Sequence, residues 1–152
     1  EMALSLPVIV TGTDLVLLDI KSFDPDTYRA LTGGEVAPTL AFARRLAERG
    51  TPVWVRFVLV PGVTDDPDNV RGLAEFTAGL ANVERVEVLP FHQHGAHKWR
   101  KLGIPYPLER TRIPTAEETR AAREIFRAVG LRVCADDTEA LPDRTLTERE
   151  AG

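Results

Sequence analysis

Cysteine is almost missing from this sequence. Its 152 residues include a single cysteine, Cys134. An intramolecular disulfide bond is therefore excluded, and the default expectation is a cytoplasmic protein.

Long apolar runs and basic runs are missing as well. No stretch approaches the ~18 apolar residues of a membrane-spanning helix, and no signal-peptide pattern opens the chain. The formal net charge is −4, without the Lys/Arg clusters that bind a phosphate backbone. We therefore expect neither a membrane nor a nucleic acid as a partner. The first residue is Glu1 rather than methionine, and we favour a segment of a longer chain over a trimmed start.

Strand-like and helix-like segments alternate along the chain. Residues 53–60 are β-branched and aromatic and lie between two prolines, which is typical of a strand. Residues 15–18 form a short continuous apolar run, which suits a strand buried on both faces of a parallel sheet. Two capping patterns predict helix starts, at Asp24-Pro25 and at Thr115 with Glu118. Further strands are predicted at 86–89 and 131–135, and a loop of about twenty residues follows the third strand.

This alternation predicts an α/β fold with parallel strands and right-handed crossovers. Four strands are too few for a closed eight-stranded barrel, and the first strand would need a neighbour on each side. We therefore expect a partial parallel (β/α) barrel, truncated at its N-terminal side, over residues 1–135, with a polar and flexible tail at 136–152. The exposed edge of the first strand should favour self-association.

Ionisable residues occur at or near the ends of three predicted strands. Asp19 and Lys21 end the first strand. Arg56 lies within the second strand, and His92 follows the third. Ligands of parallel α/β folds bind at the carboxyl ends of the strands, so we expect these side chains to surround one opening.

Arg56 is the most informative of these residues, because a guanidinium in a buried strand is costly unless it is paired. Two pairings are open. Asp19 could accept its hydrogen bonds within the protein. Alternatively, Lys21 and Arg56 could hold the carboxylate of a ligand while Asp19 accepts from an ammonium or binds a cation. Together with His92, this set suits a zwitterionic amino acid better than a plain anion.

The long loop contains three histidines, His92, His94 and His97. They raise the alternative of a metal hydrolase with a zinc site in this loop. Their spacing fits no helical face within this glycine-containing loop, and Cys134 is remote in the sequence. We therefore regard metal binding here as the weaker interpretation.

Four separated motifs resemble, in order and spacing, one known family. They are LVLLDIK at 15–21, VWVRFVLVPG at 53–62, NVE at 82–84 leading to LPFH at 89–92, and HKW at 97–99. The chain resembles the C-terminal half of the pyruvate formate-lyase activating enzymes, which are radical S-adenosylmethionine (SAM) enzymes that activate glycyl radical enzymes. The resemblance implies a partial barrel, a SAM site and a [4Fe–4S] cluster held by a three-cysteine motif in the full-length family.

Several residue roles follow from the resemblance alone. Asp19 and Lys21 are similar to an Asp-x-Lys element that contacts the methionine end of SAM, and Arg56 to a SAM-contacting arginine. Leu89 and His92 resemble the segment near the adenosine. Asp19, with the carbonyl of Leu17 nearby, resembles the ligands of a monovalent cation.

The resemblance predicts the SAM-binding portion of an activating enzyme. It implies a glycyl radical enzyme of the pyruvate formate-lyase type as partner and a flavodoxin-type protein as reductant. Because the chain has one cysteine, it offers no set of iron–sulfur ligands, and we expect the isolated chain to be inactive. The other alternative is a non-catalytic module that binds SAM or docks a partner and complements a second chain.

Overall fold

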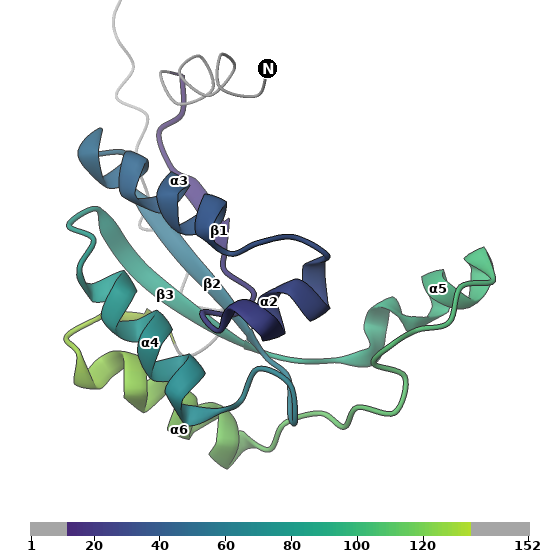
Figure 1. The fold of residues 1–152 in the computed structure, drawn as a ribbon. Coiled ribbons are helices and arrows are strands. Elements are labelled where there is room, and N and C mark those ends of the chain that lie inside the picture. The colour runs from purple at the N-terminus through teal and green to yellow at the C-terminus, as the bar shows by residue number, and fades with distance from the viewer. Residues whose placement is uncertain (1–11, 135–152) are drawn as a thin grey trace, which may run out of the picture.

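The computed structural model describes residues 12–134 and shows a parallel sheet covered by helices (Figure 1). The predicted tail at 136–152 lies outside the described residues. In chain order the elements are β1 (Val16–Asp19), α2 (Pro25–Thr32), α3 (Ala37–Glu48), β2 (Val53–Leu59), α4 (Pro67–Ala78), β3 (Val83–Pro90), a 3-10 turn (Gln93–Gly95), α5 (Ala96–Leu102), α6 (Ala116–Ala128) and β4 (Val133–Cys134).

The sheet order is β1-β2-β3-β4, and each neighbouring pair is parallel. The prediction of an α/β fold with parallel strands is thereby confirmed. Among residues 12–134, β1 pairs on one side only, with β2. Self-association through its other edge stays a prediction. No helix within this range is long and apolar enough to cross a membrane.

One face of the sheet forms the core. Side chains alternate along β2, so that Val53, Val55, Phe57 and Leu59 are buried while the residues between them are partly exposed. Helices α3, α4 and α6 all pack against this buried face, through residues that include Leu46, Leu73 and Phe126 (Figure 1). The other face carries the alternate residues of each strand, and we call it the open face.

Two sequence predictions need correction. The third strand was predicted at 86–89, but it spans Val83–Pro90 because Arg85 pairs with Trp54 and Pro90 pairs with Leu59. The twenty-residue stretch after it was predicted as a loop, but it contains the 3-10 turn and α5. Both predicted helix caps are confirmed, since Asp24 accepts from Thr27 N at 2.8 Å and Thr115 forms a capping box with Glu118.

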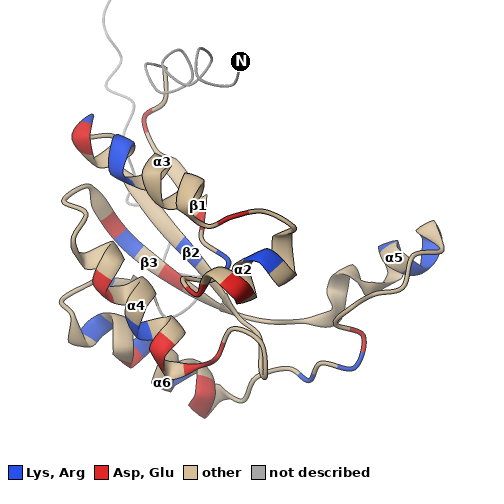
Figure 2. Ribbon diagram, viewed as in Figure 1, with Lys and Arg blue, Asp and Glu red and all other residues tan. Residues whose placement is uncertain are grey.

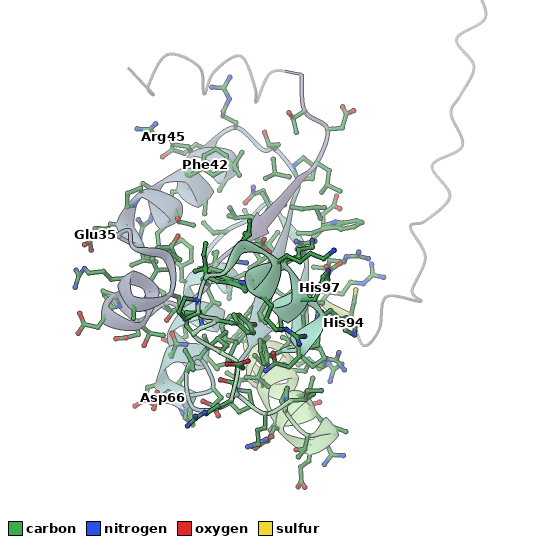
Figure 3. All side chains as sticks on the ribbon, turned by 90° about the vertical axis from the view of Figure 1, so that its right-hand side faces the viewer. Glu35, Phe42, Arg45, Asp66, His94 and His97 are labelled. Atoms are coloured by element: carbon green, nitrogen blue, oxygen red, sulfur yellow. The ribbon has the colours of Figure 1, made fainter. Side chains whose placement is uncertain are left out.

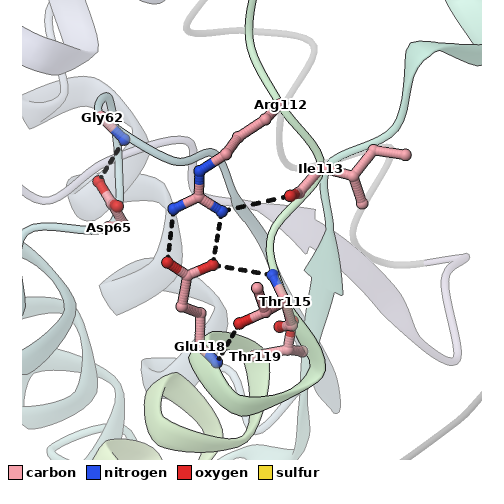
Figure 4. A network of polar contacts seen from close by, with 7 residues as sticks. All are labelled: Gly62, Asp65, Arg112, Ile113, Thr115, Glu118 and Thr119. Carbon is pink, nitrogen blue, oxygen red and sulfur yellow. Dashed lines mark hydrogen bonds and ion pairs between the residues drawn. The ribbon is translucent and has the colours of Figure 1, made fainter.

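A polar latch joins the chain after α5 to the start of α6 (Figure 4). The Arg112 guanidinium donates to both Glu118 oxygens, at 2.7 and 2.5 Å, while Glu118 also accepts from Thr115 N at 2.8 Å. The hydrogen bonds from Arg112 and then from Thr115 lower the pKa of the Glu118 carboxyl to about 2. The latch therefore keeps its charges at neutral pH.

Candidate functional site

The open face of the sheet carries the polar residues that the sequence singled out. The residues on this face of the strands include Asp19 in β1, Arg56 in β2, and Glu87 and Leu89 in β3. Figure 3 views the molecule from the side, with Glu35, Phe42, Arg45 and Asp66 of the helical layer on one side and His94 and His97 on the other. Asp19 and Arg56 alternate with the strand residues that are buried against the helices, so they lie on the face of the sheet away from those helices.

Asp19, Lys21 and Arg56 form one ionic group on this face. Arg56 Nε donates to Asp19 Oδ1 at 3.0 Å and Nη2 to Oδ2 at 3.4 Å, and Lys21 Nζ lies 3.4 Å from Asp19 Oδ2. The pairing arises because Asp19 is the direct register partner of Arg56 across β1 and β2. The internal pairing considered from the sequence is thus formed. The group still carries one formal positive charge, since two cations share one carboxylate.

The protonation of Asp19 follows from this group. Partial burial by itself raises the pKa of the Asp19 carboxyl. The hydrogen bond from Arg56 and the charges of Lys21 and Arg56 outweigh it, so the pKa lies below its usual 3.8. All three side chains stay 35 to 43% exposed. The group is therefore charged at neutral pH and open to a ligand.

A second polar layer lies beside this group and was missed from the sequence. The Arg85 guanidinium sits 3.4 Å from the centroid of the Trp54 ring and donates to Glu87 at 2.5 Å. Glu87 is in turn the register neighbour of Arg56. The Arg85 and Glu87 side chains are only 15 and 17% exposed. This pair is therefore mostly buried and offers little surface to a ligand. The alternation of charged and apolar residues at 85–88 was the signal that could have revealed it.

The segment that leaves β1 is fixed by Asn69 of α4, which the sequence analysis also missed. The Asn69 Oδ1 atom accepts from Ser22 Oγ at 2.8 Å, Phe23 N at 2.8 Å and Asp24 N at 2.9 Å. Its amide nitrogen donates to the Thr64 carbonyl at 2.9 Å. Asn69 is 6% exposed, and it anchors the chain directly after Lys21.

The remaining predicted residues lie at different distances from the ionic group. Leu89 pairs with Val58 in the register and lies on the open face, one strand from Arg56. His92 lies five residues after Glu87 in the sequence, and an extended chain of that length spans at most roughly 16 Å. It is exposed, and its Nδ1 accepts from His94 N at 3.3 Å with the two rings 4.1 Å apart. The structure therefore brings together Asp19, Lys21 and Arg56, whereas the polar and ring contacts of His92 are with His94.

The structure bears differently on the predicted monovalent-cation site and on the zinc alternative. For the monovalent cation, Leu17 and Asp19 have the same parity in β1, but both Asp19 oxygens already accept from Arg56 or lie beside Lys21. A cation there would share the Asp19 oxygens with these two side chains, since an ionised carboxylate offers about four lone-pair sites. For the zinc alternative, no three His, Cys, Asp or Glu side chains within residues 12–134 gather so as to hold a metal ion, and His92, His94 and His97 are among those residues.

A separate groove of about 700 Å³ lies on the helical side of the molecule, between α2, the start of α3 and the start of α4. It is lined by apolar residues that include Phe23, Val36 and Leu40, with Asp24 and Asp66 at the two helix caps. None of the site residues predicted from the sequence lines it.

Comparison with known proteins confirms the resemblance. The chain is 50% identical over 118 residues to the pyruvate formate-lyase-activating enzyme of Streptococcus mutans serotype c, covering 78% of this chain and 45% of that protein. It is 51% identical over 110 residues to the enzyme of the same name from Staphylococcus aureus strain USA300, covering 72% of this chain and 44% of that protein. This chain is homologous to part of the pyruvate formate-lyase-activating enzymes. It spans about 45% of the length of these activating enzymes.

Solved structures agree on the fold. A crystal structure of a domain of a pyruvate-formate lyase-activating enzyme from Bacteroides vulgatus superposes with a TM-score of 0.72 at 24% identity, over 87% of this chain and 73% of that one. A radical SAM methyltransferase from Sphaerobacter thermophilus superposes with a TM-score of 0.60 at 23% identity, over 78% and 32% of the two chains. The fold is thus shared with activating-enzyme and radical SAM domains. No family model matches the chain.

Proposed function

We propose that this chain is the part of a pyruvate formate-lyase-activating enzyme that binds the amino-acid end of SAM. The observation that carries the proposal is the group of Asp19, Lys21 and Arg56, held together on the open face of a parallel sheet. The sequence identity with activating enzymes supports the choice of ligand.

The charges of this group fit an amino acid. Lys21 and Arg56 supply two cations that would bind a carboxylate, and Arg56 can do so through two parallel hydrogen bonds. Asp19, ionised at neutral pH, would accept from the ammonium. A bound zwitterion would then share the two cations with Asp19. The Asp19 and Leu17 cation site and the contacts of Leu89 and His92 with the adenosine belong to the same proposal.

SAM, when it is bound and reductively cleaved in activating enzymes, supplies a 5′-deoxyadenosyl group that abstracts hydrogen. That cleavage depends on an iron–sulfur cluster, and the residues of this chain do not fit one. The sequence has one cysteine, whereas such clusters are held by several thiolates. We therefore assign this chain the binding and orientation of SAM, and we propose that it is inactive alone.

The names of the relatives point to pyruvate formate-lyase as the enzyme acted on. We propose a glycyl radical enzyme of this type as the partner of the whole activating enzyme. A flavodoxin-type reductant would donate electrons to the iron–sulfur cluster, and it would therefore bind the part of the enzyme that holds the cluster. The single cysteine also favours a second candidate, a non-catalytic module that binds SAM or docks the partner for another chain.

Calorimetric titration with SAM tests the binding role. We expect weak binding by the wild-type chain, and a further loss of about 10- to 100-fold in Arg56→Ala because a hydrogen-bonded charge partner of the carboxylate is removed. Arg45→Ala is the matched control, since Arg45 lies on α3 on the opposite side of the sheet (Figure 3). Equal affinity of the Arg56 variant and the wild type would refute the assignment.

A further inference from the structure

The segment 93–113, which we call the arm, stands away from the body of the protein. It contains α5 and the chain that returns to α6, and it extends past the end of the sheet (Figure 1). It also contains the HKW motif, which the SAM site does not use.

The charge of the arm is opposite to that of the rest of the chain. The arm holds five Lys or Arg residues and one Glu, which leaves 14 Lys or Arg and 22 Asp or Glu elsewhere. The cations on α5 are visible at its end in Figure 2. Within residues 12–134, the ion pairs of the arm involve Arg112 alone. The others, Lys98, Arg100, Lys101 and Arg110, are exposed to solvent.

The arm is internally braced. The Trp99 and Tyr106 rings pack with centroids 5.4 Å apart, and Ile104 N donates to the Trp99 carbonyl at 3.2 Å. At its base, the Gln93 side chain donates to the carbonyls of Leu108 at 2.8 Å and Thr111 at 3.0 Å. The Arg112–Glu118 latch then fixes the arm to α6. A braced arm loses little conformational entropy when it binds a partner.

The arm also exposes apolar side chains. Leu102 is 71% exposed and Ile104 49%, and with Ile113 they make up three of the four large hydrophobic residues that are exposed within residues 12–134. Arg100 and Lys101 directly precede Leu102 in the sequence. Exposed apolar side chains next to charged ones are a composition found at protein-docking surfaces.

We infer that the arm is a docking surface for an acidic protein surface with an apolar recess. This rests on the proposed function, because we assign the acidic surface to the pyruvate formate-lyase-type partner. Charge screening has a length of about 8 Å at physiological ionic strength. Outside the arm, residues 12–134 hold 12 Lys or Arg and 15 Asp or Glu, so this part of the chain does not attract an acidic partner. The projecting cationic arm would meet such a partner first and steer it.

The geometry favours a protein over a membrane or a nucleic acid. Helix α5 has seven residues, which is short for an amphipathic helix that lies in a membrane interface. The Trp99 ring packs against Tyr106, whereas single-stranded nucleic acids stack their bases on exposed aromatic rings.

Binding of the full chain to purified pyruvate formate-lyase, measured by biolayer interferometry at about 0.15 M salt, tests this inference. The double variant Arg100→Glu, Lys101→Glu should weaken binding by about 10-fold or more, mainly through a slower association rate. Leu102→Ser should weaken it by about 30-fold, because Leu102 would fill the apolar recess of the partner. The matched control is Arg45→Glu, Arg49→Glu, which reverses two cations at the C-terminal end of α3 instead of α5.

Equal weakening by the control would overturn the inference, because it would show a general effect of charge. So would a wild-type chain that does not bind pyruvate formate-lyase, or one that binds a DNA duplex or phosphatidylserine vesicles through the same arm residues. SAM titrations of the same variants separate the two proposals. If SAM binds but the arm variants keep wild-type affinity for pyruvate formate-lyase, docking by the arm fails and the SAM site stands.

Discussion

Replacing Asn69 by alanine is expected to destabilise the protein by about 3 kcal/mol or more. Its side-chain oxygen accepts from Ser22 Oγ, Phe23 N and Asp24 N in a buried setting. Each donor left without an acceptor costs about 1–3 kcal/mol. Urea unfolding followed by circular dichroism measures the loss. Because this segment directly follows Lys21, the variant should also weaken SAM binding.

The control for this prediction is Ser22→Ala. It removes one of the three donors to Asn69 and leaves the two backbone donors in place. Its expected cost is about 1 kcal/mol. Equal unfolding midpoints for Asn69→Ala and the wild type would show that Asn69 does not anchor the exit of β1.

The second large effect is expected for Phe126→Ala, at about 3–5 kcal/mol. Phe126 is fully buried and joins α6 to the sheet, with its ring centroid 6.1 Å from that of Phe57. Alanine would leave a cavity between the two layers. A loss of this size approaches the whole stability of a small domain, which is about 5–15 kcal/mol, so the variant should populate unfolded chains without denaturant.

The neighbouring Arg127→Ala serves as the control, since Arg127 is exposed and forms a surface pair with Glu124 at 2.6 Å. Such pairs contribute about 0–1 kcal/mol. Differential scanning calorimetry would compare the two variants. A loss below about 1 kcal/mol for Phe126→Ala would mean that the α6 layer does not depend on this contact.

Local patterns in the sequence predicted the local structure well. The caps at Asp24 and Thr115 are encoded within four residues, and the apolar run of β2 carries its own strand signal. The pairing of Asp19 with Arg56 could be stated only as one of two alternatives. Which one forms depends on the register between β1 and β2, and register is a long-range property.

Features that depend on distant contacts could not be predicted. Asn69 looks like an ordinary residue in the first turn of a helix, and only the fold brings it to the exit of β1, 46 positions away from Phe23. Gly72 looks like a weak point in α4, but a Cβ atom there would lie 2.4 Å from the Phe23 ring. The packing of Arg85 on Trp54 likewise requires the β2–β3 register.

The central claim is that Asp19, Lys21 and Arg56 bind the amino-carboxylate end of SAM. NMR titration of the labelled chain tests it most directly, with SAM, methionine and 5′-methylthioadenosine, which lacks that end, as ligands. The account predicts that SAM and methionine shift the side-chain signals of Asp19 and Arg56, and that 5′-methylthioadenosine leaves them in place. Equal shifts with 5′-methylthioadenosine, or SAM-induced shifts confined to other residues, would contradict it.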